Sequence, residues 1–385
     1  MISDADQHIF ETATMWRDYS DPAKRDLALT IEEDELGYPW VVSPALGIRI
    51  FDAYIPTPQD DFAALGGPRH RRLKGLPSEI DFERDLPLDY YDARARVAKL
   101  DVFGIDKALQ TPNYAIVWGR KVQHRTDILQ ANMEAWNRRA AELQADGGGR
   151  LLVAGHVTMR GDDPDWLDDQ LAFLERSGIR TTFLSYGLVD GRRLSHPDHD
   201  RAWASFVEHG VVPVFHIIDN EQHPSNFPEE WFEGDDPFTA AAEYPFCYFG
   251  IQLALADLVM RGVFEKHPGL KILVTEQQAN WLPAMARGLE MSYDAQYRQL
   301  GRHVCDLELR PTEYLQRQVR FAAHWAADDI LSLRDLFGDI FMFGGDYPHC
   351  EGLVSPYEDY RHAVGNLAPD VERALYGETM DAFLN

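Results

Sequence analysis

The chain has 385 residues, of which 45% are hydrophobic and 12% aromatic, enough to bury a large core in one or two domains. Its formal net charge of −26 argues against nucleic acid and anionic membrane as partners, because both require a basic face. The three cysteines form no CxxC pair, and we find neither a leader-like N-terminus nor an apolar run of membrane-spanning length. We therefore expect a soluble, cytoplasmic protein.

The first predicted strand, Ile2–Asp6, leads to two side chains that bind metals well. Asp6 and His8 are two residues apart, a spacing that points both to one face of a strand. Taken alone, this pair is more typical of a polar N-terminal arm than of a metal site. Residues 17–86 are rich in Asp, Glu, Pro and Gly and lack a helical period. They indicate a loop or lid subdomain inserted into a single domain, 1–385.

From Tyr90 onward, helix and strand patterns alternate. The predicted helices cover residues 91–103, 127–146, 164–177, 199–209, 252–266, 281–298 and 328–337, with a further segment at 307–317. The predicted strands cover residues 2–6, 105–110, 151–157, 179–184, 211–218, 270–275, 319–323 and 340–343. Such alternation predicts a parallel α/β sheet, and eight units predict a closed (β/α)8 TIM barrel. The alternative is an open doubly wound sheet, but no G-x-G-x-x-G follows a strand.

In a barrel enzyme, the residues at the C-terminal ends of the strands face the active site. In this chain the candidates at those ends are Asp6, His8, His216, Glu276, His324 and Asp346. Histidines and carboxylates on one rim suit a first-row divalent metal with open positions for water and substrate. Any one of these histidines alone would more often be a packing residue, but their shared placement indicates a metal centre.

Four motifs together resemble the amidohydrolase superfamily, and its "amidohydrolase 2" branch in particular, which includes aminocarboxymuconate-semialdehyde decarboxylase. They are D-x-H followed by a glutamate, V-F-H-I, G-V-F-E-K-H-P-G-L-K-I-L-V-T-E-x-x-x-N-W-L-P, and F-G-G-D-Y-P-H-x-E-G. The resemblance implies a (β/α)8 barrel with one divalent ion, Zn²⁺ first and Mn²⁺ as the alternative. It also implies Asp6, His8, His216 and Asp346 as the ligands, with Asp346 near the proton-transfer step.

Two positions depart from the family pattern. The family decarboxylases usually carry a catalytic histidine after strand six, where this chain has Glu276. Glu276 is either a second acid–base group or a carboxylate that holds His216 or the Asn280-Trp281 turn. Strand four lacks the lysine that bridges two metals in binuclear amidohydrolases, so we expect a single ion.

Other residues near the strand ends have expected roles as well. We expect His324 to orient the substrate, and His349 and Glu351 to support the loop after strand eight. The aromatic and proline-rich segment 219–246 suits a lid over an apolar or aromatic substrate. It suits a subunit contact equally well, so we also expect a homodimer.

These features favour a metal-dependent hydrolase, in which activated water attacks an amide, ester or lactone-type bond of a small aromatic or apolar molecule. The alternative is non-oxidative decarboxylation of an aromatic or unsaturated carboxylic acid. That reaction calls for a cation near the substrate carboxylate, and Arg160 after strand three is the obvious candidate. A third hypothesis is a catalytically silent barrel that acts as a binding protein, for which a degraded ligand set is expected. The ligand set here is intact.

Overall fold

The computed structural model describes residues 1–56, 71–161, 163–217, 248–303, 306–322, 330–350 and 352–385. Parallel strands form its centre, in two hydrogen-bonded arcs with the orders β1-β5-β6 and β12-β11-β10-β9-β8-β7. The strands are β1 (Ser3–Ile9), β5 (Lys107–Pro112), β6 (Leu151–Val153), β7 (Gly155–His156), β8 (Thr181–Phe183), β9 (Val212–His216), β10 (Ile272–Thr275), β11 (Val319–Ala322) and β12 (Phe341–Met342).

Backbone hydrogen bonds join the two arcs at both ends. Ala154, which separates β6 from β7 within the predicted third strand, donates its N–H to Gln110 O at 2.8 Å. At the other junction, Ala5 N–H donates to Phe343 O and His8 N–H donates to Tyr347 O, both at 2.8 Å. The eight strand positions therefore close into a ring, and the predicted (β/α)8 TIM barrel is confirmed.

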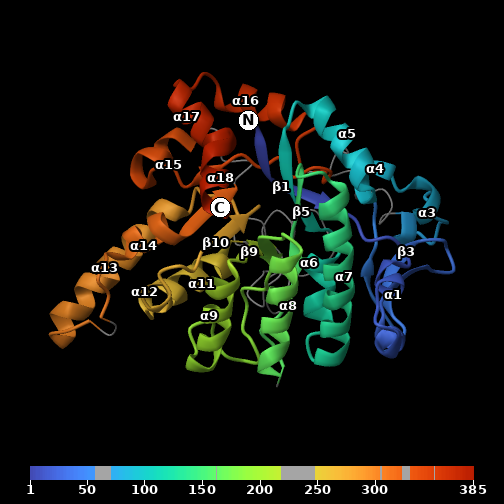
Figure 1. The fold of residues 1–385 in the computed structure, drawn as a ribbon, viewed down its shortest axis with the longest axis horizontal. Helices are drawn as coiled ribbons and strands as arrows, with labels where there is room; N and C mark the ends of the chain where they lie inside the picture. Colours follow the sequence, from blue (N-terminus) through green and yellow to red (C-terminus); the bar gives the residue numbers. More distant parts are fainter. Residues whose placement is uncertain (57–70, 162, 218–247, 304–305, 323–329, 351) are drawn as a thin grey trace.

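Helices surround this barrel, and α7, α8 and α9 stand side by side along one flank (Figure 1). The wall helices are α5 (Ala93–Phe103), α7 (Thr126–Asp146), α8 (Pro164–Arg176), α9 (Asp200–His209), α11 (Phe249–Met260), α12 (Val263–Lys266), α13 (Leu282–Leu300), α14 (Pro311–Gln318) and α15 (Ile330–Phe337). The single helix predicted over 252–266 is wrong, because Gly262 adopts φ 76° and separates α11 from α12. Among the described helices, none combines the length and apolar character needed to cross a membrane.

The remaining helical segments lie between the strands or at the C-terminus. They are α1 (Met15–Asp18), η1 (Pro22–Leu27), α3 (Phe82–Asp85), α4 (Leu88–Tyr91), α6 (Ala115–Lys121), η2 (Pro197–His199), α16 (Pro356–Val364), α17 (Pro369–Arg373), η7 (Ala374–Glu378) and α18 (Thr379–Leu384). Met380 and Phe383 of α18 join the buried apolar cluster of inward-facing strand residues: Ala5, Leu109, Ala154, Val212, Val214, Leu273, Ala322 and Met342. Helix α18 therefore fills one end of the barrel with side chains and leaves the other end for the polar residues.

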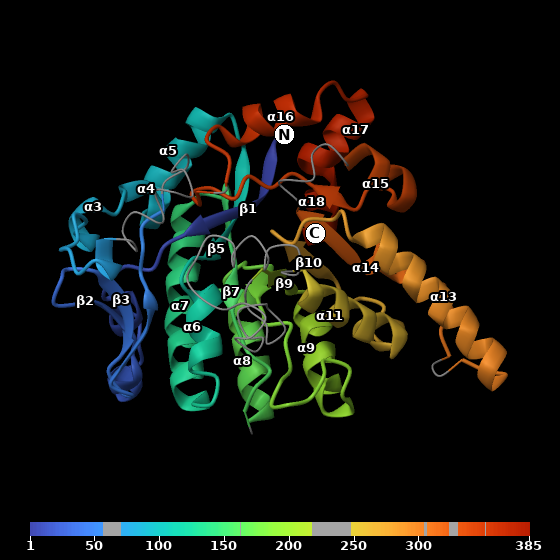
Figure 2. The same cartoon turned by 180° about the vertical axis from the view of Figure 1, so that it is seen from behind.

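The inserted segment contains a small antiparallel sheet in the order β2 (Thr30–Glu33), β3 (Pro39–Ser43), β4 (Ile48–Asp52). It lies beside α1, at the opposite end of the molecule from α13, which projects away from the barrel (Figures 1 and 2). Tyr114 donates its hydroxyl to Tyr54 O at 3.1 Å, and Tyr90 donates to Pro56 O at 2.9 Å, so the segment after β4 is tied to the barrel. Residues 57–70 lie outside the described residues, and the role of 17–86 as a lid stays a prediction.

Candidate metal centre

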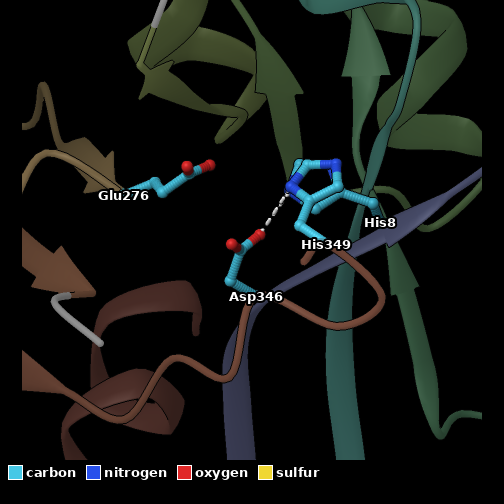
Figure 3. Close-up of side chains that lie close together, drawn as sticks. All are labelled: His8, Glu276, Asp346 and His349. Carbon is cyan, nitrogen blue, oxygen red and sulfur yellow. Dashed lines mark ion pairs between the residues drawn. The ribbon is translucent and has the colours of Figure 1, made fainter. Parts of the chain in front are cut away.

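Five of the six predicted strand-end residues meet at the mouth of the barrel, and all five are buried. The donor atoms of His8, Glu276, Asp346 and His349 lie within 4.8 Å of one another, as do those of Asp6, His8 and His216. Figure 3 shows the first group converging from different elements. The sixth predicted residue, His324, lies outside the described residues, as do Glu351 and the segment 219–246.

An irregularity in β1 places Asp6 and His8 in this group. Asp4 is paired with Ala108, and Gln7 with Gln110, so three steps along β1 face two along β5. Such a bulge re-aims side chains and is common beside active sites. Asp6 Oδ1 lies 4.0 Å from His8 Nε2, so the two side chains face the same space.

Asp346 reaches the same point from the loop after β12. Its backbone adopts φ 51° and its N–H donates to Asp6 O at 2.7 Å, which fixes the two carboxylate-bearing residues to one another. Asp346 Oδ1 lies 3.2 Å from His8 Nε2. The preceding Gly345 is required sterically, since a Cβ there would lie 2.6 Å from Asp4 Oδ2. A left-handed conformation at a non-glycine residue is costly and is typical of functional sites.

Neighbouring strands β9 and β10 bring His216 and Glu276 together. His216 is in register with Thr275, so Glu276 begins the loop directly beside it. Glu276 also adopts a positive φ, 55°, and its Oε2 lies 3.2 Å from His216 Nε2. His216 Nε2 is in turn 3.7 Å from Asp6 Oδ1, so the glutamate faces the same space as the predicted ligands.

Hydrogen bonds to residues outside the group determine which ring nitrogen of His8 and of His216 is free of a proton and faces the group. Thr111 donates its hydroxyl to Gln7 O at 3.2 Å, and therefore accepts Nδ1–H of His8 at 3.0 Å. His216 Nδ1 lies 3.3 Å from the carbonyl oxygen of Ile217, an acceptor. Both rings thus keep Nε2, the nitrogen that faces the group, as a lone-pair donor for a metal.

Asp4 supports the two loops that carry the carboxylates. Its side chain accepts hydrogen bonds from the backbone N–H of Asp6 at 3.0 Å, from that of Gly345 at 2.9 Å, and from Gln7 Nε2 at 2.8 Å. Complete burial raises the pKa of Asp4 to about 7, although these donors oppose the shift. Sequence reasoning missed this residue, because its only signal was a further aspartate two residues before Asp6.

His349 takes part more directly than the sequence suggested. Its Nδ1 lies 2.8 Å from Asp346 Oδ1, its Nε2 lies 2.8 Å from Asn113 Oδ1, and its ring stacks on His8 with centroids 3.9 Å apart. We expected His349 to support the loop after strand eight. Within that loop, the group that it contacts is the carboxylate of Asp346. The i, i+3 spacing of the two residues was the available signal.

Glu11, the glutamate of the strand-one motif, has a structural partner of its own. Its carboxylate accepts the backbone N–H groups of Tyr114 and Ala115 at 2.8 and 3.0 Å, at the start of α6. Burial raises its pKa to about 7. Glu11 therefore anchors a helix terminus beside the centre.

The donor set fits a divalent ion. Both carboxylate oxygens of Asp6 and Nε2 of His216 are fully buried and make no hydrogen bond within the described part of the chain. Buried groups of this kind are costly to leave unsatisfied, and ion coordination is one way to satisfy them. Nitrogen and oxygen donors together suit zinc or manganese. β8 contributes Thr181, Thr182 and Phe183, so no lysine is available there to bridge a second ion.

Comparison with known proteins shows the family of this chain. A family model described as amidohydrolase matches residues 80–379. The chain belongs to the amidohydrolase family. The match confirms the resemblance to the amidohydrolase 2 branch. No curated protein matches this amidohydrolase.

Solved structures share the fold of this amidohydrolase over its whole length. An amidohydrolase from Mycobacterium avium subsp. paratuberculosis K-10 has a TM-score of 0.79 at 22% identity, covering 100% of this chain and 97% of that one. A manganese-bound 5-carboxyvanillate decarboxylase from Novosphingobium aromaticivorans has a TM-score of 0.67 at 18% identity, covering 100% and 97%. A 2,6-dihydroxybenzoate decarboxylase from Rhizobium has a TM-score of 0.60 at 14% identity, covering 100% and 98%.

Proposed function

We propose that this amidohydrolase is a metal-dependent hydrolase acting on an amide, ester or lactone-type bond of a small aromatic or apolar molecule. The observation that carries the proposal is the position of Glu276. Its carboxylate lies 3.2 Å from Nε2 of His216, on the side of the ring that faces the predicted ligands. A carboxylate beside a metal site is well placed to act as a second acid–base group, as glutamates do beside zinc in deaminases.

Asp6, His8, His216 and Asp346 are the proposed ligands of one ion, Zn²⁺ first and Mn²⁺ as the alternative. When bound, such an ion lowers the pKa of water and polarises a substrate oxygen. Asp346 is the group that takes the proton from the attacking water and passes it to the leaving group. Nδ1 of His349 lies 2.8 Å from Oδ1 of Asp346, and this contact keeps the Asp346 carboxylate oriented. Glu276 is the second acid–base group.

Non-oxidative decarboxylation is the second candidate. It is favoured by the similarity in fold to the two decarboxylases from Novosphingobium and Rhizobium. Glu276 opposes it, because it adds a third carboxyl group to those of Asp6 and Asp346, one more than the two positive charges of a single divalent ion offset. Arg160, the expected receptor of that carboxylate, bonds instead to Asp190 Oδ1 at 3.1 Å and to Leu188 O.

Metal content and substrate turnover test the proposal together. The protein is purified without added metal, analysed by elemental mass spectrometry, and screened against aryl esters, lactones, anilides and aromatic carboxylic acids. Hydrolysis in H₂¹⁸O is expected to place one ¹⁸O in the product acid. Release of CO₂ with no ¹⁸O uptake would favour the decarboxylase instead. A preparation that neither contains nor takes up metal would contradict both reactions and leave the silent binding barrel.

We also propose that the protein is a cytoplasmic homodimer. Helix α13, which projects from the barrel, exposes Met291, Tyr297 and Leu300 by 64%, 58% and 58%. Apolar side chains on a projecting helix are suited to contact another subunit. Size-exclusion chromatography with light scattering should give twice the chain mass of 43.9 kDa. A mass of one chain at all concentrations would contradict the dimer.

A further inference from the structure

Arg96 of helix α5 is fully buried, although its side chain carries a permanent positive charge. Its Nε donates to Asp89 O at 2.7 Å, and its Nη1 donates to the side-chain oxygens of Gln110 at 2.6 Å and Gln7 at 3.4 Å. These partners are all uncharged carbonyl oxygens, and the described part of the chain gives the guanidinium no ion pair. A buried charge is costly to keep in such surroundings, which points to a role beyond packing.

Two glutamine side chains connect Arg96 to the carboxylate of Asp4. Gln110 accepts from Arg96 at 2.6 Å and donates its amide N–H to the side-chain oxygen of Gln7 at 3.0 Å. Gln7 in turn donates to Asp4 Oδ2 at 2.8 Å. All four side chains are fully buried. The three hydrogen bonds therefore form one continuous path from the guanidinium to the carboxylate, which we name the glutamine chain.

The two ends of the glutamine chain fix the direction of every hydrogen bond in it. A guanidinium can only donate, and the carboxylate of Asp4 accepts three N–H groups. Each glutamine amide must therefore turn its oxygen toward Arg96 and its nitrogen toward Asp4. Amides aligned head to tail polarise one another, which strengthens the hydrogen bonds along the path. The orientation of both glutamines thus depends on the donor at the start of the path, Arg96.

The far end of the glutamine chain reaches the proposed metal ligands. Asp4 Oδ1 accepts the backbone N–H of Asp6 at 3.0 Å and that of Gly345, which precedes Asp346, at 2.9 Å. Gln7 lies at the end of the bulge in β1. Movement of Gln7 or Asp4 would therefore displace carboxylate ligands on two separate segments at once.

Arg96 also contacts the loop that carries Asp346. Its guanidinium carbon lies 5.0 Å from the ring centroid of Tyr347, the residue after Asp346, within the range of a cation–π interaction. The hydroxyl of Tyr347 donates to Asp89 Oδ2 at 2.7 Å, and the carbonyl oxygen of Asp89 accepts from Arg96. One arginine thus touches both β1 and the loop after β12, the two segments that supply three of the four proposed ligands.

We propose that Arg96 is a positioning residue for the metal centre. Through the glutamine chain it holds Asp4, and Asp4 holds the backbone of the two segments that present Asp6 and Asp346 to one ion. Without the guanidinium, the first glutamine loses its donor and can turn, so the two carboxylates are no longer held at one spacing. The inference rests on the proposed ligand set, and not on hydrolysis or any other reaction class.

The affinity of the full-length protein for Zn²⁺, measured by competition with a chromogenic chelator, tests this role. Arg96→Met keeps an extended side chain but offers no donor, so we expect the affinity to weaken roughly 10- to 100-fold, the range for residues that support metal ligands. Co²⁺ in place of Zn²⁺ adds a spectroscopic readout, because its visible absorption depends on the coordination geometry. The Co²⁺ spectrum of the variant is expected to differ from that of the parent, which a loss of stability alone would not cause.

Variants of Gln110 and Arg94 complete the test. Gln110→Met leaves the arginine in place but interrupts the glutamine chain, and should weaken Zn²⁺ binding roughly 10-fold or more. Because both changes act on one path, the double variant should bind Zn²⁺ within about twofold of Arg96→Met alone. Arg94→Met replaces an exposed arginine two positions earlier on α5, and this matched control should bind like the parent. If Arg96→Met does not fold, the affinity and Co²⁺ spectrum of Gln110→Met decide.

Three results would overturn the inference. They are an unchanged affinity and Co²⁺ spectrum in folded Arg96→Met or Gln110→Met, losses of affinity that multiply in the double variant, and an equal loss in Arg94→Met. A parent protein that binds neither ion would overturn the proposed metal centre and this inference with it. A parent that binds metal, with variants that bind equally well, would contradict only the role of Arg96.

Discussion

His216 and Glu276, sixty positions apart in the sequence, face each other across the adjacent strands β9 and β10, with Nε2 and Oε2 3.2 Å apart. The histidine is fully buried and the glutamate nearly so. Glu276 reaches this position only because its backbone adopts φ 55°, a conformation that a glutamate rarely takes without a compensating interaction. The pair therefore brings a proposed metal ligand next to the proposed second acid–base group.

Glu276→Gln tests the acid–base role. The amide keeps the size of the side chain but can neither take up nor release a proton, so we expect kcat for the best ester or lactone found in the screen to fall roughly 10²- to 10⁴-fold. Metal content should be unchanged, because Glu276 is not among the proposed ligands. If the glutamate only orients His216, kcat falls far less and metal affinity drops instead. Parallel kinetics and elemental analysis separate the two roles.

His216→Ala and Asp346→Asn test the ligand set. Each removes or weakens a donor at the buried site, so we expect less than half of the parent's metal per chain after purification and dialysis. His362→Ala and Asp370→Asn, which change exposed residues on α16 and α17, are matched controls and should keep the parent's metal content. Full occupancy in both site variants would refute the proposed coordination.

Asp4→Asn tests whether the buried aspartate positions the centre. An asparagine still offers one carbonyl oxygen to the N–H groups of Asp6 and Gly345, but it turns an amide donor toward the donor Nε2 of Gln7. We expect metal affinity, measured by competition with a chromogenic chelator, to weaken roughly 10- to 100-fold, the range for residues that support metal ligands. Unchanged affinity in a folded variant would show that Asp4 serves stability alone.

Glu11 predicts a pH dependence of stability. Its folded pKa of about 7 lies above the ordinary 4.5, so the folded state holds a proton that the unfolded chain releases. Stability should therefore fall as pH rises from about 4.5 to about 7 and then level off, by about 3 kcal/mol in total from this group. In Glu11→Gln that contribution is absent.

Urea unfolding of the Glu11 variant and its parent at pH 5, 6, 7 and 8 gives the difference in free energy of unfolding. The difference is expected to shift in favour of the variant across this range. Glu358→Gln, at an exposed position on α16, is the control and should show a constant difference. A constant difference for Glu11→Gln as well would mean that the helix-terminus donors hold the carboxylate ionised.

The sequence by itself determined the barrel and most of the centre. Glycines after the helices and apolar runs after the glycines were enough to predict alternating units, because caps and hydrophobic periods are local properties. Parallel strands end at one rim, so residues at strand ends were expected to meet, and Asp6, His8, His216, Glu276 and Asp346 do.

Only the tertiary structure decided how these residues face one another. The bulge in β1 and the positive φ of Glu276 and Asp346 arise from contacts between strands far apart in the chain, which no local pattern records. The same holds for Asp4, which bridges the first and last strands, and for His156. Nδ1 of His156 has no hydrogen-bond partner among the described residues, and this is visible only once the surrounding residues are in place. The local sequence determines which side chains reach the rim of the barrel. Packing across the barrel determines the distances between these side chains, and catalysis depends on those distances.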